Sequence, residues 1–193
     1  MKKFELTDET IIHNGRILHR IKALKNFGDI QSGKLGGYVE KEDNLSQSGD
    51  AWLYDDAKVY GNTMVYDNAR VYGNAEVNGN ARVYGDARVY GNAWVYGNAI
   101  VSGNAEVNGN TKVNGNAMVS GNADYTTIKG FETKYRDTTF FRTKDNKICV
   151  VCGCFSGTIE EFRKQVKRTR SGKIAKEYLA IADLMELHFK KIK

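Results

Sequence analysis

The chain of 193 residues contains no proline, only three cysteines and no apolar run long enough to span a membrane. The absence of proline suits a backbone whose N–H groups are mostly committed to hydrogen-bonded ladders. An odd number of cysteines argues against a disulfide framework and for a reducing compartment. Met1-Lys2-Lys3 precedes polar residues rather than an apolar stretch, which predicts no secretory signal. We therefore expect a cytoplasmic protein that makes no use of a membrane.

The sequence also lacks an even spread of charge. Residues 1–52 carry 8 basic and 8 acidic groups, residues 53–124 carry 5 and 7, and residues 125–193 carry 16 and 8. The net charge of +6 is therefore a property of the C-terminal third. Only that region invites an anionic partner on charge alone.

What the chain does contain is a six-residue repeat that runs without a break from Leu53 to Asp124. Its twelve copies approximate Val-Tyr-Gly-Asn-Ala-Arg, with a large apolar residue first and a small residue four positions later. A fixed period fixes the architecture, because each copy supplies one short strand and one turn. Three hexads make one triangular coil with valine and alanine inside. Residues three hexads apart then stack, which predicts a side-chain ladder of Asn62, Asn80, Asn98 and Asn116.

The segments that flank the repeats predict separate units. Residues 1–34 contain Asn14-Gly15 between two apolar runs, which is a strong β-hairpin signal, and they predict an N-terminal β cap. Residues 35–124 form the parallel β-helix, which begins with a degenerate coil around Asn44-Leu45-Ser46. Atypical end repeats are expected in a stacked architecture, because each end must be capped.

Residues 125–193 predict a C-terminal α+β domain. Residues 138–143 and 148–152 read as two strands of a β-hairpin. Thr158 begins a capping box that opens one helix, and a second helix runs from about Lys173 to Lys191. The fold class is thus mainly β, with a small α+β unit at one end.

The hexads resemble those of left-handed parallel β-helix proteins, whose best-known members are acyltransferases. The whole chain is similar to hexapeptide-repeat proteins of bacteriophages and prophages, and the features that carry this resemblance are Lys34-Leu35-Gly36-Gly37-Tyr38-Val39, Asn44-Leu45-Ser46-Gln47, the V-Y-G-N-A units and Cys152-Gly153-Cys154-Phe155-Ser156-Gly157-Thr158. The resemblance implies a left-handed helix, an exception to the right-handed crossover rule. It also implies a homotrimer in the cytoplasm of a bacterial host. It implies no particular activity and no cofactor.

Each strand presents two outward residues, so the coils predict three outer faces. Face one shows Arg70 above Arg88, beside the aromatic residues Trp52, Tyr54, Tyr72 and Tyr90. Arginine can clamp a phosphate and an aromatic ring can stack on a base, so these residues form the predicted ligand-binding set. Arg82 and Tyr84, from face three, complete it. The alternative is that the tyrosines stack for stability alone.

Face three is the most apolar of the three. Met64, Ile100 and Met118 would form an exposed patch that monomers usually cover. We expect either the C-terminal helices or a neighbouring subunit to cover it, and closed symmetry favours the second kind of assembly.

Catalysis is not predicted. An acyltransferase of this fold uses a histidine as general base, and the three histidines, His13, His19 and His188, all lie outside the repeats. The repeats also lack the long loop insertion that carries substrate sites in such enzymes. We therefore predict no catalytic residue and regard the acyltransferase alternative as disfavoured.

The cysteines do not predict a metal site. Cys149, Cys152 and Cys154 lack a fourth ligand, and an alternating strand places Cys149 and Cys152 on opposite faces. Small buried apolar cysteines are the preferred interpretation. A reactive thiol near the turn at Gly153 is the alternative.

A basic run crosses the junction of the two predicted helices, and the predicted partner-binding residues in it are Arg163, Lys164, Lys167 and Arg168. A solvated helix face is the simplest interpretation, while nucleic acid, an anionic small molecule or an acidic host protein are alternatives. Together these features predict a non-catalytic oligomer, a phage accessory protein that counters host defence by sequestering a nucleotide-type signal molecule. The alternative is an antagonist or scaffold that binds a host protein through the basic helices.

Overall fold

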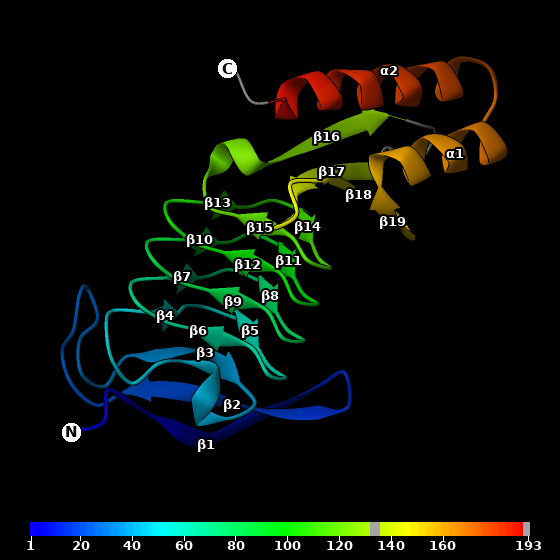
Figure 1. The fold of residues 1–193 in the computed structure, drawn as a ribbon. Coiled ribbons are helices and arrows are strands. Elements are labelled where there is room, and N and C mark those ends of the chain that lie inside the picture. The colour runs from blue at the N-terminus through cyan, green and yellow to red at the C-terminus, as the bar shows by residue number, and fades with distance from the viewer. Residues whose placement is uncertain (132–135, 191–193) are drawn as a thin grey trace.

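The computed structural model describes residues 1–131 and 136–190, and it shows a stack of coils with a β cap at one end and helices at the other (Figure 1). In the described part of the chain, strands of two residues follow one another at six-residue intervals. They are β4 (Trp52–Leu53), β5 (Lys58–Val59), β6 (Met64–Val65), β7 (Arg70–Val71), β8 (Glu76–Val77), β9 (Arg82–Val83), β10 (Arg88–Val89), β11 (Trp94–Val95), β12 (Ile100–Val101), β13 (Glu106–Val107), β14 (Lys112–Val113) and β15 (Met118–Val119).

These strands form three parallel columns, which are the three predicted faces. Face one is β4-β7-β10-β13, face two is β5-β8-β11-β14, and face three is β6-β9-β12-β15. Neighbours in a column are three hexads apart in the sequence, as in the pair of Arg70 and Arg88. The predicted β-solenoid with parallel sheets and three hexads per coil is confirmed.

The interior of the solenoid is filled by the large apolar residue and the small residue of each hexad, which are fully or almost fully buried except for Ala123 of the last hexad. Each buried valine contributes roughly 1.5–3 kcal/mol to folding. The predicted asparagine ladder is also confirmed, because Asn62 donates to Asn80 at 3.2 Å, Asn80 to Asn98 at 3.1 Å, and Asn98 to Asn116 at 3.4 Å. The ladder ties one corner of successive coils together.

The N-terminal cap is built on the predicted hairpin. Strands β1 (Phe4–His13) and β2 (Arg16–Ala23) pair antiparallel, and the Asn14-Gly15 turn between them has positive φ at both residues. Strand β3 (Leu35–Val39) pairs antiparallel with β2 and parallel with β5, so the cap continues directly into face two. Leu45 follows the short η1 turn (Glu42–Asn44) and bridges to Val65, which confirms a degenerate first coil.

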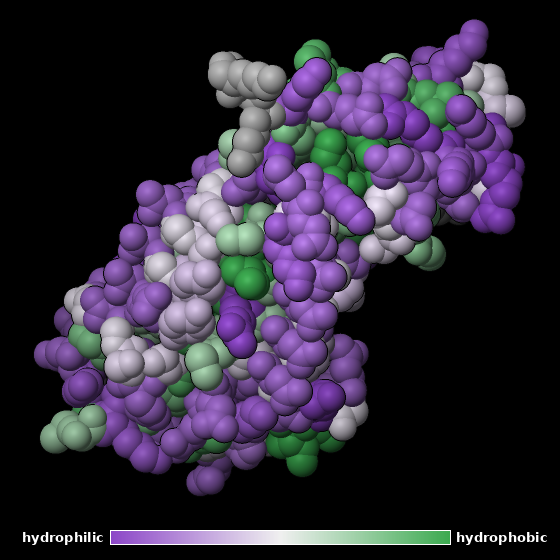
Figure 2. Space-filling model, in the orientation of Figure 1, coloured by the Kyte–Doolittle hydropathy of each residue, from purple (hydrophilic) through white to green (hydrophobic). Residues whose placement is uncertain are grey.

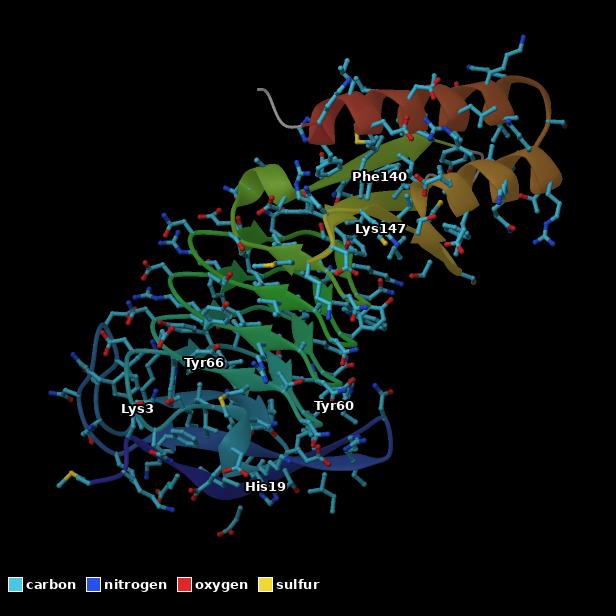
Figure 3. The ribbon with its side chains drawn as sticks, in the orientation of Figure 1. Lys3, His19, Tyr60, Tyr66, Phe140 and Lys147 are labelled. Atoms are coloured by element: carbon cyan, nitrogen blue, oxygen red, sulfur yellow. The ribbon has the colours of Figure 1, made fainter. Side chains whose placement is uncertain are left out.

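A buried lysine fastens the cap to the first coil. Lys3 is 1% exposed, and its ammonium donates to the backbone carbonyls of Ser48, Gly49 and Ala51 (Figure 3). The ammonium also lies 5.1 Å from the centre of the Phe27 ring. Burial lowers the pKa of Lys3 to about 8, although the neighbouring Asp50 opposes that shift.

The lowered pKa of Lys3 predicts a pH dependence of stability. Between pH 8 and 10.5 the unfolded chain still binds a proton that folded Lys3 has lost, so stability rises with pH in this window. The rise attributable to Lys3 is up to about 3 kcal/mol. Urea denaturation across this window should show it in the parent protein and in a Lys2→Met control, but not in Lys3→Met. An unchanged slope in Lys3→Met would contradict the assignment.

The C-terminal domain is a four-stranded antiparallel sheet with two helices. The strands are β16 (Tyr125–Phe131), β17 (Arg136–Arg142), β18 (Ile148–Cys152) and β19 (Phe155–Thr158), and the helices are α1 (Ile159–Thr169) and α2 (Gly172–Phe189). A short η2 turn (Asn122–Asp124) connects this sheet to the solenoid. The predicted central strands and the capping box of Thr158 and Glu161 are confirmed. Strands β16 and β19 were not predicted, because their sequences lack a clear alternation.

The sheet of this domain separates the solenoid from the helices (Figure 1). Phe141 and Val151 join the apolar core of the solenoid, whereas Phe140 and Val150 pack with α1 and α2. Figure 3 shows Phe140 beneath α2. The helices therefore cover the far side of the sheet and not face three. The expectation that the C-terminal helices cover face three is wrong. No helix within residues 1–131 and 136–190 is long and apolar enough to cross a membrane.

Candidate functional site

Four of the predicted ligand-binding residues line one shallow hollow on face one. Tyr54, Arg70, Tyr72 and Arg88 form it together with the acidic residues Asp29 and Asp55. Its volume is about 400 Å³, and small-molecule sites usually measure roughly 300–1,000 Å³. The hollow lies where the loop between β2 and β3, which carries Asp29, meets the turn after β4 and the outer surface of β7 and β10.

The two arginines of this hollow are paired with carboxylates. Arg70 lies 3.1 Å from Asp29, and Arg88 lies 3.2 Å from Glu106 of β13. All four side chains are partly exposed, and ion pairs of this kind contribute only about 0–1 kcal/mol. An anionic ligand can therefore replace either carboxylate at small cost. With Asp55 also present the lining has no net charge, so charge alone does not select a bare phosphate.

The tyrosines form a continuous aromatic column beside the arginines. Tyr72 and Tyr90 are stacked with centroids 5.1 Å apart, and Tyr54 meets Tyr72 edge-on at 5.9 Å. The Tyr54 hydroxyl donates to both carboxylate oxygens of Asp29 at 3.2 Å. Burial raises the pKa of Tyr54 to about 12, so this phenol keeps its proton at neutral pH. Stacked rings of this kind also stabilise a fold, so the alternative that the tyrosines stack for stability alone stays open.

The prediction that Trp52 binds ligand from face one is wrong. Its side chain is fully buried, with the ring of Phe27 at 5.4 Å and that of Phe4 at 6.4 Å, both in edge contact. The N-terminal cap folds over this end of face one and removes the first strand of the column from the surface. Trp52 is therefore a core residue between cap and solenoid.

Arg82 and Tyr84 lie outside the hollow. Arg82 belongs to β9 on face three, where its strand neighbours are Met64 and Ile100. Tyr84 stacks on Tyr66, with centroids 4.8 Å apart. Both residues lie on the column of face three, along which Figure 2 shows apolar patches. Met64 and Met118 of that column are 46% and 40% exposed.

The basic run of the C-terminal domain divides in two. Lys164, Lys167 and Arg168 are exposed on α1. Arg163 instead bonds to Asp183 at 2.6 Å and to Glu186, both on α2, and these bonds raise the pKa of Arg163. The predicted partner-binding role of Arg163 is thus replaced by a role in joining the two helices, while the other three remain open to a partner.

The tertiary structure brings together one polar cluster that sequence reasoning missed. The tip of the β1–β2 hairpin turns up beside face two, where Figure 3 labels Tyr60. His13 Nε2 lies 3.1 Å from Glu76 Oε1, although His13 is outside the repeats. Glu76 is only 8% exposed, and it also accepts a hydrogen bond from Tyr60 at 3.1 Å. Amide donors from Asn14 and Asn78 complete the cluster around the Tyr60 hydroxyl.

The length of the hairpin was the available signal for this contact. A strand of ten residues spans roughly 33 Å, whereas the coil strands that run alongside it have two residues each. A hairpin of that length reaches beyond the edge of the first coils, and nothing local to His13 shows to which side it bends.

The cysteines lie as alternation predicts. Cys149 packs against the solenoid core, and Cys152 faces the helices on the other side of β18. Burial raises the pKa of the Cys149 thiol. Cys154 is exposed, so the buried interpretation is wrong for that residue. Within the residues that the structure describes, no group of three or more His, Cys, Asp or Glu side chains could hold a metal ion.

The comparisons with known proteins concern the repeats. The family model "YdcK Beta solenoid repeat" matches residues 69–85 and 81–97. The Uncharacterized acetyltransferase YdcK of Escherichia coli (strain K12) is 30% identical over 63 residues, covering 28% of this chain and 19% of that protein. The match thus spans about a fifth of the relative's length. Together with the fold, these similarities identify a hexapeptide-repeat β-solenoid protein.

Proposed function

We propose that this protein binds and sequesters a nucleotide-type anion in the hollow of face one, without chemical conversion. The observation that carries the proposal is the meeting of two arginines and two tyrosines in one hollow of suitable size. The backbone that holds them is hydrogen-bonded from coil to coil, so we expect little ordering entropy to be lost when a ligand binds.

The mixed charge of the hollow fits a whole nucleotide better than a bare phosphate. A phosphate group takes Arg70 and Arg88 from their exposed carboxylate partners and gains bidentate, charge-assisted hydrogen bonds. Asp29 and Asp55 then accept hydrogen bonds from ribose hydroxyls or a base amino group. The ring edges of the tyrosine column can make edge-to-face contacts with the base.

The proposal includes self-association through face three. Met64 and Met118 are exposed there, and the C-terminal helices do not cover them. Of the two covers expected for this face, a neighbouring subunit is therefore the one that we propose. A closed homotrimer would bury this face and present three copies of the hollow. Action as a phage counter-defence protein in the bacterial cytoplasm rests on the family resemblance of the sequence.

Thermal shift and native mass spectrometry with a panel of nucleotides and cyclic dinucleotides test this proposal. We expect one class to raise the Tm, since a ligand at about 100 times its Kd stabilises by about 2.7 kcal/mol. The Arg70→Ala/Arg88→Ala variant should lose this shift. A Lys58→Ala/Lys112→Ala variant removes the same charge from face two and should keep it. Absence of stabilisation by every compound would overturn the proposal, and a monomer would overturn the trimer.

A second candidate function is acyl transfer, which the contact of His13 with Glu76 favours. A carboxylate that orients a histidine is a common arrangement for general-base catalysis. The repeats contain no histidine, but the β1–β2 hairpin places His13 beside them. The repeats still lack the loop insertion that carries substrate sites in such enzymes, which counts against an enzyme. Turnover of acetyl-coenzyme A that is lost in Glu76→Gln but kept in Arg70→Ala/Arg88→Ala would favour this function over sequestration.

The host-protein antagonist remains the alternative from a third class, and the exposed Lys164, Lys167 and Arg168 favour it. Charge reversal at these three positions would then abolish biological activity. The Arg70→Ala/Arg88→Ala variant would leave that activity unchanged.

A further inference from the structure

A small cavity lies in the C-terminal domain, between the turn that joins β18 to β19 and the helix pair. Its volume is about 130 Å³. Its lining comes from β18, β19, the turn between them, and both helices with the C-cap of α1. This cavity is separate from the solenoid and from the hollow of face one.

Three aromatic rings form part of the cavity wall, those of Phe155, Phe162 and Tyr178. The ring of Phe162 lies 5.6 Å from Phe155 at 51° and 5.7 Å from Tyr178 at 88°, so faces and edges of rings alternate around it. Val166, 3% exposed, closes one side. An apolar cavity of roughly 150 Å³ can hold one benzene ring, and aromatic rings favour edge-to-face contacts of this kind. The cavity therefore fits a single six-membered ring.

The polar part of the lining favours an acidic substituent on that ring. Gln165, Thr169 and Arg170 come from the last turn of α1 and its C-cap. Arg170, whose guanidinium donates to the carbonyl of Thr169 at 3.1 Å, gives this part of the lining its positive charge.

The surroundings of the cavity reinforce this preference for an anion. A neighbouring surface hollow shares Phe155 and Gln165 with the cavity and carries Lys164 and Arg168. Its acidic residue, Glu161, bonds to the backbone N–H of Thr158 in the capping box. The two basic residues of this hollow outnumber its one carboxylate, which favours an anion beside the cavity.

We propose that this cavity is a binding site for a small aromatic carboxylate. The ring packs against the wall formed by Phe155, Phe162 and Tyr178, and its carboxylate lies beside the Arg170 guanidinium. The site works independently of the face-one hollow, because the two share no residue.

Benzoate is the probe for the first test, and the thiols provide the readout. Cys154 is exposed and lines the cavity, so a bound ring should slow its alkylation by iodoacetamide, as followed by mass spectrometry. Cys149 lies on the opposite side of the sheet and serves as the internal reference. We expect benzoate to protect Cys154 selectively and to raise the Tm. Benzyl alcohol, which has the ring without the charge, should bind roughly tenfold more weakly.

Variants separate ring binding from charge recognition. Val166→Phe fills the cavity and should abolish protection of Cys154. Arg170→Gln should bring the affinity for benzoate down to that for benzyl alcohol, and it keeps the test decisive if Val166→Phe does not fold. Lys167→Gln removes the same charge from the exposed face of α1 and should bind benzoate like the parent. The proposal is overturned if benzoate neither protects Cys154 nor raises the Tm, or if Lys167→Gln weakens binding as much as Arg170→Gln.

Discussion

Replacing Trp52 with alanine should lower the free energy of unfolding by about 3–5 kcal/mol, the usual cost of removing a buried tryptophan. Its side chain is fully buried between the cap and the first complete coil, where it contacts Phe4 and Phe27. Alanine would leave a cavity beneath the cap, and neighbouring backbone that is hydrogen-bonded to the coils cannot collapse into it.

Trp94 provides a matched control for this prediction. It occupies the same position of its hexad as Trp52, directly before the inward apolar residue, but it is 40% exposed and lies beneath the ammonium of Lys112. Trp94→Ala should cost about 1 kcal/mol, the scale of an exposed cation–π contact. Urea denaturation followed by circular dichroism measures both losses. Equal losses for the two variants would contradict the packing of the cap on Trp52.

Replacing Gly36 with alanine should cost about 3 kcal/mol, the upper end of the usual cost of overpacking. A Cβ atom at Gly36 would lie 2.6 Å from the backbone oxygen of Leu53 and 2.7 Å from the Trp52 ring. The backbone oxygen cannot move without breaking the stack, so the cap itself would have to lift. The Gly-Gly pair of the Lys34–Val39 motif therefore permits the close approach of β3 to the solenoid.

Gly121→Ala is the control for the Gly36 substitution. Gly121 also has an extended backbone, and a Cβ atom there meets nothing within 4 Å. Its free energy of unfolding should change by less than about 0.5 kcal/mol. Hydrogen exchange of β1 and β2 in Gly36→Ala locates the damage, and protection equal to that of the parent would contradict a lifted cap.

The sequence predicted the solenoid well because its information is periodic. Each hexad repeats the same inward residues and the same turn, so one copy describes them all, and residues three hexads apart must become neighbours. The asparagine ladder and the pairing of Arg70 with Arg88 in one column follow from that period alone. The α1 capping box was equally local, since Thr158 and Glu161 satisfy each other's backbone within one turn.

The candidate site depended on contacts that no period encodes. Asp29 reaches Arg70 from a loop that precedes the repeats, and the period gives no information on where that loop lies. Strands β16 and β19 were missed because their residues gain order from sheet pairing with β17 and β18 rather than from their own pattern.

The sequence by itself determined the stacked coils, their three faces and the hairpin at the start of the chain, because short-range backbone preferences and a strict repeat leave few alternatives. Only the tertiary structure decided which positions of a face are surface. Trp52 and Trp94 are equivalent in the repeat, yet one is buried by the cap and the other remains exposed. The placement of His13 against Glu76 was decided in the same way. The physical reason is that burial depends on which distant segment packs over a residue, and this is a property of the whole chain.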